Sequence, residues 1–317
     1  MKTLSRCRPA FRILPSAFLV CALMGAGCGL IRARPERPDA KAPAAPTVDN
    51  GVPTPEQLTR YLNSQAGLLQ SIESRDLSID IRAPGANVGL DGGSLLCQKP
   101  RYFRLIGKKF GSQEVLVGSN EERFWFFVKR DPSDALFHCS YSDFEKGLID
   151  LPFPFEPEWV LEALGMGTVD PNGKFRVEEN KNTYVLIEDT NLRGRKIRKE
   201  TVFYKGTAKG DQPQVKTRTM FDDRNKIICM ATIKTVTRIP VDRGPNAKSA
   251  VVVCPQSIKL EWPAQETELI LELGRVQVNE RLAMDSFQMP RLGSKQIDLG
   301  RDRPTSRSGV MPARGIR

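Results

Sequence analysis

The sequence predicts a mainly β protein with helices (α+β), in which a long antiparallel sheet curls into an unclosed half-barrel. Apolar residues recur with a period of two in one segment after another, and glycine- and asparagine-containing turns separate these segments. Helical periodicity is confined to one segment before the strands and one among them. About a dozen strands in one sheet must curl or close. Such a half-barrel can hold an apolar ligand in its concavity.

The composition narrows the class of protein. The chain has 317 residues, a formal net charge of +11 and 40% hydrophobic residues. This is enough apolar material for a packed core, which argues against wholesale disorder and against a polytopic membrane protein. His138 is the single histidine. We therefore expect no histidine-rich metal site, no metal ligation and no cofactor.

The first 27 residues have the order of a secretory signal peptide. Four basic residues precede an apolar run at 13–24, which is too short for a membrane span of about 20 residues. Gly25, Ala26 and Gly27 then lead directly into Cys28. This resembles the lipobox of bacterial lipoproteins, in which the cysteine is acylated. The alternative is an ordinary signal peptide with a chance cysteine.

Residues 28–54 form the next segment, a proline-rich tether behind Cys28. Its prolines alternate with alanine and mixed charges, a composition that gives an extended spacer without a core. We therefore expect lipid anchoring in the bacterial cell envelope, on the outer membrane facing the periplasm. Such a tether would hold a globular domain at 55–298 away from the bilayer.

A helix is predicted at 55–73 at the start of this domain. Thr54 can cap it, Pro55 suits its first turn, and apolar residues recur on one face. The period then changes to two at Leu77, which begins the first strand, 77–83. Further strands follow at 88–98, 101–108, 114–119, 123–129 and 135–141.

A second helix is predicted at 156–164. Pro157 suits its start and Gly165 its end. The remaining strands are predicted at 174–179, 183–188, 195–205, 214–222, 226–238, 250–262 and 267–278.

The end of the chain, 299–317, is expected to be a basic disordered tail. Five arginines between 301 and 317 face a single aspartate, with serine, glycine and proline between them. Such a tail can attract anionic lipid head groups. The alternative is a solubilising tail without a partner, and export argues against nucleic acid.

Four cysteines remain after the signal peptide and Cys28, and all lie in predicted strands. An exported protein can oxidise them, and four cysteines allow three connectivities. We favour Cys97–Cys139 with Cys229–Cys254, and buried free thiols are the alternative. No pair has the short spacing of a zinc site.

The order of elements resembles the bacterial lipoprotein-carrier family, the LolA-like periplasmic carriers and LolB-like outer-membrane receptors. The matching segments are Pro-Arg-Tyr-Phe-Arg-Leu at 100–105, the hairpin at 117–126, and Leu-Pro-Phe-Pro at 151–154. The resemblance covers roughly residues 55–235. It implies an amphipathic helix before an unclosed barrel, a helical lid, and a cavity that accepts acyl chains.

On this resemblance we expect Phe103, Leu105, Trp125 and Phe127 to contact the ligand. The strand at 123–129 is apolar on both faces and must be covered on both. The alternative for each of these residues is plain core. The expected ligand is a membrane lipid or an acylated lipoprotein.

The turn at Lys108-Lys109-Phe110 is expected to touch a membrane or an acylated cargo. An aromatic ring in a turn beside two lysines suits a bilayer surface, where the amines meet phosphates. The alternative is that Phe110 folds back onto the helix at 55–73.

Nothing in the sequence indicates an enzyme. It lacks Gly-x-Ser-x-Gly, a P-loop and His-Glu-x-x-His, and adjacent His138 and Cys139 point to opposite faces of a strand. A non-catalytic acyl-binding lipoprotein is the favoured function. The alternatives are an envelope scaffold or sensor that binds a protein partner with the same fold, and an unrecognised hydrolase.

Overall fold

We describe the protein from a computed structural model, which covers residues 51–146, 149, 156–205, 214–242 and 249–301. The chain divides into two compact units, Met1–Pro38 and Asp39–Arg317. All of the described residues belong to the second unit, and the predicted signal peptide, Cys28, the tether, the 151–154 motif and most of the tail lie outside them.

One sheet of 14 strands dominates the fold, in the order β14-β6-β5-β4-β3-β2-β1-β13-β12-β11-β10-β9-β8-β7. Neighbours are antiparallel, except that β14 runs parallel to β6. In the described residues β14 and β7 are the two edges, so the sheet is unclosed, as predicted. The strands are β1 (Ser71–Ala83), β2 (Ala86–Gln98), β3 (Tyr102–Lys109), β4 (Ser112–Ser119), β5 (Arg123–Val128), β6 (Ala135–Ser140), β7 (Phe175–Glu179), β8 (Thr183–Leu192), β9 (Arg195–Tyr204), β10 (Val215–Phe221), β11 (Ile227–Val241), β12 (Ala250–Trp262), β13 (Thr267–Val278) and β14 (Lys295–Asp298).

The helices are few and short. They are α1 (Pro55–Leu68), α2 (Tyr141–Glu145), α3 (Pro157–Ala163) and the 3₁₀ turns η1 (Pro263–Gln265) and η2 (Met284–Phe287). Thr54 and Gln57 form a reciprocal capping box at the start of α1, which confirms the predicted cap. Within the described residues no helix has the length and apolar character needed to cross a membrane.

Helix α1 ends earlier than predicted. Asn279, which follows β13, accepts a hydrogen bond from the Gln70 backbone N–H and donates one to the Leu68 carbonyl. These bonds satisfy backbone groups at the end of the helix and turn the chain into β1. Leu69 and Ile72, expected on the apolar helix face, are buried beyond the helix end instead.

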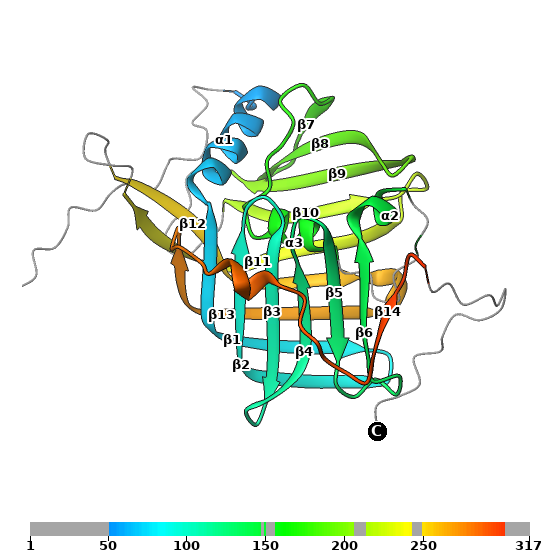
Figure 1. The fold of residues 1–317 in the computed structure, drawn as a ribbon. Coiled ribbons are helices and arrows are strands. Elements are labelled where there is room, and N and C mark those ends of the chain that lie inside the picture. Colours follow the sequence, from blue (N-terminus) through cyan, green and yellow to red (C-terminus); the bar gives the residue numbers. More distant parts are fainter. Residues whose placement is uncertain (1–50, 147–148, 150–155, 206–213, 243–248, 302–317) are drawn as a thin grey trace, which may run out of the picture. The chain divides into compact units, whose positions relative to one another are not determined.

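The sheet curls around α3 (Figure 1). Buried side chains of β2 and β3 share one apolar cluster with those of β9, β10 and β11, although these strands lie far apart in the sheet order. The side chains of α3 and of the intervening strands β1, β13 and β12 belong to the same cluster and connect them. Leu58 and Leu62 place α1 against the inner side of β8 and β9, through Leu186 and Phe203. We call the large cluster around α3 the concave core.

The segment after β13 crosses the outer face of the sheet, and we call residues 279–299 the C-terminal strap. Its Met289 and Leu292 pack on a separate cluster of Ile106, Leu116, Trp125, Phe127 and Leu136. Phe287 is buried against the Tyr102 ring, with centroids 5.3 Å apart. The strap then adds β14 to the edge of β6. It therefore covers the outer face of a strand that the sequence shows to be apolar on both sides.

The favoured disulfides are wrong, because all four described cysteines are buried free thiols. Cys97 lies in the concave core, whereas Cys139 lies in a different cluster beside Phe124 and Phe144. Burial raises the pKa of the Cys139 and Cys254 thiols to about 12. These thiols stay protonated at neutral pH, so they behave as small apolar core residues.

Candidate functional site

The concave core is mostly apolar where it faces α3, and its far wall also carries Lys199 of β9 and Arg218 of β10. Its other sheet residues are aliphatic and aromatic side chains with methionine, alanine and buried cysteines, from strands on both sides of the barrel. Alternation along each strand places these residues on the inner face. The inner face of the half-barrel therefore offers an apolar surface with α3 lying on it.

Helix α3 and the residues after it fill this concavity. Pro157 at its first position suits the start, and Gly165 with a positive φ of 86° ends it. This segment contributes six apolar residues to the concave core: Trp159, Val160, Leu161, Ala163, Leu164 and Met166. The Trp159 ring packs edge-on against Trp262 of β12 at 5.6 Å between centroids. The ligand volume expected from sequence is therefore occupied by the protein's own side chains.

The N-cap glutamate of α3 and the two glutamates within it each pair with a cation from a strand or from a residue next to one. Glu156 accepts two hydrogen bonds from Arg193, at 3.1 and 2.6 Å, and Glu158 lies 3.5 Å from Arg101. Arg193 also stacks on the Phe144 ring of α2, with its Cζ 3.6 Å from the ring centroid. Arg101 precedes β3 and Arg193 lies between β8 and β9, in opposite halves of the sheet order, so they fasten α3 from both sides.

The third glutamate, Glu162, bridges two cations of the far wall. Its carboxylate is 3.0 Å from Lys199 of β9 and 3.3 Å from Arg218 of β10. Burial raises the pKa of Glu162, but attraction to Lys199 and Arg218 outweighs it and leaves the pKa below its ordinary value. The pKa of Glu158 is shifted in the other direction, because burial raises it more than Arg101 lowers it. Glu162 is thus the glutamate whose charge is stabilised in the folded protein.

The four residues expected to contact a ligand lie in two clusters. Phe103 and Leu105 are buried in the concave core. Trp125 and Phe127 are buried in the cluster beneath the C-terminal strap, on the outer face. The four therefore do not share one cavity, although each is fully or nearly fully buried.

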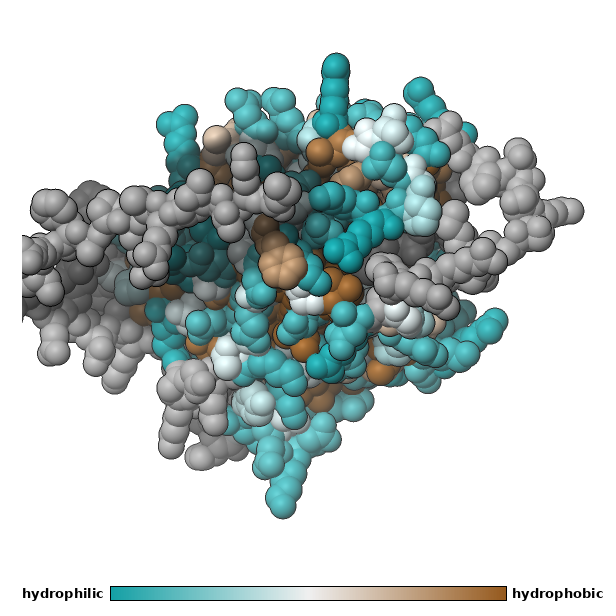
Figure 2. Space-filling view, turned by 90° about the horizontal axis from the view of Figure 1, so that it is seen from below, coloured by the Kyte–Doolittle hydropathy of each residue, from teal (hydrophilic) through white to brown (hydrophobic). Residues whose placement is uncertain are grey.

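The turn between β3 and β4 presents Phe110 to solvent. Its ring is 98% exposed, so it does not fold back onto α1. Phe110 adopts a positive φ of 50°, and the Lys109 amine lies 5.9 Å from its ring centroid. The hairpin projects from the lower end of the sheet in Figure 1. Figure 2 shows that end from below, where apolar atoms surface among hydrophilic side chains.

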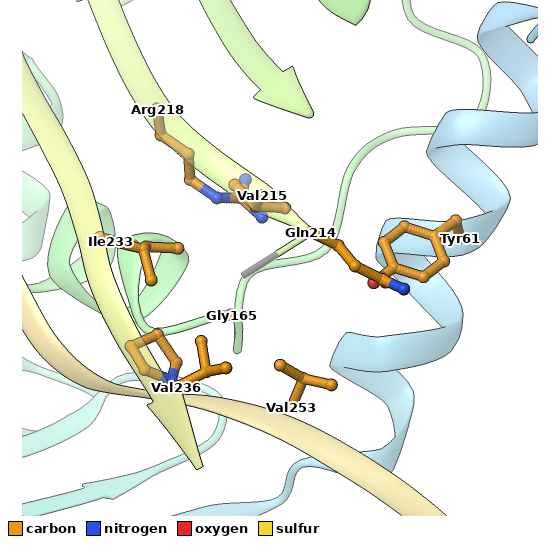
Figure 3. A pocket seen from close by; sticks show the side chains of 10 residues that line it. Tyr61, Gly165, Gln214, Val215, Arg218, Ile233, Val236 and Val253 are labelled. Atoms are coloured by element: carbon orange, nitrogen blue, oxygen red, sulfur yellow. The ribbon is translucent and has the colours of Figure 1, made fainter. Parts of the chain in front are cut away.

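A small cavity remains between α1, the end of α3 and strands β10–β12 (Figure 3). Its volume is about 50 Å³, far below the ~300 Å³ of the smallest typical ligand pockets. Three polar side chains line it, from Tyr61, Gln214 and Arg218.

Sequence reasoning missed the cations around α3 and the polar side of this cavity. Arg218 is flanked by threonines in a strand of mixed polarity, which gives no sign that it is 6% exposed. A glutamate in each turn of α3 could have suggested paired charges, but not their partners. Among the described residues no group of three or more histidines, cysteines, aspartates or glutamates is placed to hold a metal ion.

No protein-family model matches the sequence, and no curated protein matches it. Similar solved structures include a DUF1329 family protein from Desulfovibrio piger, with 11% identity and a TM-score of 0.49 over 74% of this chain and 95% of that chain. A LolA superfamily protein from Nitrosomonas europaea has 10% identity and a TM-score of 0.44 over 73% and 97%. A Vibrio parahaemolyticus domain, named for outer membrane lipoprotein sorting, has 8% identity and a TM-score of 0.46 over 74% and 94%. The structural neighbours of this chain thus include a DUF1329 protein and LolA-superfamily proteins.

Proposed function

We propose that this protein binds the acyl chain of a lipid or of an acylated protein on the concave face of its half-barrel, beneath α3. The observation that carries the proposal is the concave core itself. Most of its lining is apolar, and a short helix held by ion pairs, rather than a further strand, fills it. In this proposal α3 is the helical lid, and Phe103 and Leu105 belong to the surface that it covers.

The free energy lost when α3 leaves the concave core is comparable to the free energy gained when an acyl chain is buried there. Withdrawing five large apolar side chains, three from α3 and two from the residues after it, costs roughly 1.5–3 kcal/mol each. Burying an acyl chain of about 16 carbons returns about 0.8 kcal/mol per methylene. Because both amounts lie near 10 kcal/mol, an acyl chain can replace α3 at a small net cost. The ion pairs of Glu156, Glu158 and Glu162 then set the threshold for this exchange.

The test is acyl binding by the mature chain with Cys28→Ser, which carries no lipid of its own. We expect a fluorescent fatty acid to bind, and co-purified lipid to appear in native mass spectrometry. Arg193→Met removes the bidentate bond to Glu156 and the contact with Phe144. It should tighten fatty-acid binding roughly two- to tenfold, because weakening a partly buried pair by about 1 kcal/mol favours the open lid.

Arg176→Met is the matched control for that variant. Arg176 pairs with Asp189 and Glu178 between β7 and β8, away from α3, so its loss should leave fatty-acid affinity unchanged. A protein that binds no acyl probe, with or without Arg193→Met, would contradict the proposal. A stable protein partner in place of lipid would favour the scaffold alternative.

We further propose that Cys28 carries an N-terminal lipid that holds the protein at the cell envelope. The support is the basic, apolar and small-residue order before Cys28. The proline-rich segment 28–54 can span roughly 80 Å at about 3.1 Å per residue. Cys28→Ala should therefore shift the protein from the membrane fraction to the soluble fraction, or leave it unprocessed. Unchanged membrane partitioning would contradict the anchor.

The β3–β4 turn is proposed as a second, reversible membrane contact through Lys108, Lys109 and Phe110. The exposed ring can enter the bilayer interface while the amines meet phosphates. In the non-lipidated chain, Phe110→Ser should weaken binding to anionic vesicles severalfold. It should change the free energy of unfolding by no more than about 0.5 kcal/mol, because the ring is already exposed in the folded protein.

Tyr204→Ser is the control for this variant, since Tyr204 is another exposed aromatic, on β9. It should leave vesicle binding intact. Equal losses for the two variants would show a general effect of surface aromatics, and an unchanged Phe110→Ser would show that the turn does not touch the membrane.

A further inference from the structure

The cavity at the end of α3 has one polar and one apolar side. Tyr61 of α1, Gln214 before β10 and Arg218 of β10 form the polar side. Val215, Ile233, Val236, Val253, Pro255, Ala163 and Gly165 complete the lining. In Figure 3 Arg218 extends along β10 toward the cavity, opposite Val236 and Val253. The volume of about 50 Å³ exceeds the ~10–15 Å³ that one water needs on the same measure, so it has room for a small polar group and not for a chain.

Arg218 is a buried cation with an unused donor. It is 6% exposed, and its Nη1 donates to Glu162 at 3.3 Å. Its Nε has no hydrogen-bond partner among the described residues. Leaving a buried charged donor unpaired is costly, and arginine donors match carboxylate oxygens in geometry and charge. The guanidinium can therefore donate a hydrogen bond to one further oxyanion on the cavity side.

The surroundings of Arg218 favour the same group. Burial raises the pKa of the Tyr61 phenol, although Arg218 and Arg238 oppose that shift. The phenol therefore stays protonated and can donate a hydrogen bond. A carboxylate in the cavity would meet two donors, the unpartnered Nε of Arg218 and the Tyr61 hydroxyl, whereas a methyl ester would offer no charge to the guanidinium. The Glu162 carboxylate uses the same guanidinium through Nη1.

Resting on the proposed function, we propose that this cavity receives the carboxylate of a single-chain fatty acid, with the alkyl chain running from it beneath α3. The apolar side of the cavity begins that path at Ala163 and Gly165, where the α3 segment meets the cavity. The ligand is thus bound with its head group at Arg218. A diacyl lipid without a free carboxylate lacks this interaction.

The experiment compares dodecanoate with methyl dodecanoate in titration calorimetry, using the mature chain with Cys28→Ser. We expect dodecanoate to bind at least tenfold more tightly than the ester. Arg218→Met should abolish that preference by weakening the acid and not the ester. Tyr61→Phe removes only the hydroxyl and should reduce the preference two- to fivefold, which keeps the test decisive if Arg218→Met fails to fold. Arg176→Met is the control and should keep the full preference.

Each possible result of this experiment either supports or overturns the carboxylate site. Equal affinity of the unsubstituted site for acid and ester would overturn the carboxylate site while leaving acyl binding intact. A preference that survives in Arg218→Met, or in Tyr61→Phe where that is the variant that folds, would overturn the assignment to this cavity. Binding of neither probe would overturn the proposed function and this inference with it.

Discussion

Glu162→Gln should destabilise the protein by about 3 kcal/mol at neutral pH. The substitution keeps the shape of the side chain and removes the charge that Lys199 and Arg218 share. Lys199 can still reach water, but buried Arg218 is left without its carboxylate partner, and breaking a buried pair costs about 3–5 kcal/mol. Urea unfolding at about pH 7 measures the loss. The same substitution loosens α3, so fatty-acid affinity should rise as stability falls.

The loss of stability in Glu162→Gln should depend on pH, and the pKa shift of Glu162 determines in which direction. The pKa of Glu162 is lower in the folded protein than its ordinary value of 4.5. Its contribution is therefore complete above about pH 4.5 and is lost as the pH falls through the folded-state pKa. The difference in stability between wild type and Glu162→Gln should narrow below about pH 4. A difference that stays constant with pH would show that the charge is not what stabilises the pair.

Glu158→Gln is the matched control on the same helix. Burial raises the pKa of Glu158, so the folded protein opposes its charge, and removing that charge should cost little. We expect a change within about 1 kcal/mol, the range of partly exposed ion pairs, because the bond to Arg101 is long at 3.5 Å. Equal losses for the two variants would mean that any polar change in α3 disrupts its packing.

Phe287→Ala should lower the melting temperature by roughly 10 °C. Phe287 belongs to the C-terminal strap, and its ring is 1% exposed and packs on Tyr102. Truncating such a buried phenylalanine costs about 3–5 kcal/mol, and each kcal/mol shifts the melting temperature by about 2–4 °C in a domain of this size. Scanning calorimetry measures the shift. A large shift would establish the strap as part of the folded core.

Met284→Ala tests the same 3₁₀ turn without the buried ring. Met284 is 46% exposed, so its loss should change the free energy of unfolding by no more than about 0.5 kcal/mol. If Phe287→Ala were as mild as Met284→Ala, the strap would be a loosely attached segment, and Trp125 and Phe127 would need no cover from it.

The alternation of apolar and polar residues was enough to predict most strands, because this pattern is visible within a few consecutive residues. The strand at Thr267–Val278 and the Thr54 cap were both predicted. The end of α1 was not predicted, because Asn279 determines it from the end of the neighbouring strand β13, about 210 residues later in the sequence. A long-range hydrogen bond leaves no trace in the sequence around residue 70.

The candidate site was only half predictable for a similar reason. Alternation shows that Phe103 and Leu105 share a face, and that Trp125 and Phe127 share one. Which faces coincide depends on turn length and on the register shift near Gly107 and Lys108, because a slip by one residue exchanges the faces. The partners of Glu162 were hidden likewise, since Arg218 lies 56 residues away.

The pairing of β1 with β13 has a consequence for how the protein is made. Ile72 lies opposite Val278, so the first strand to emerge from the ribosome must wait for the last long strand before it can pair on this side. Contacts of such sequence separation close slowly, and until then one side of β1 is a bare edge able to pair with other chains. Release of the chain before residue 278 would leave an aggregation-prone sheet. The sheet is therefore complete only once the chain has been made through residue 278.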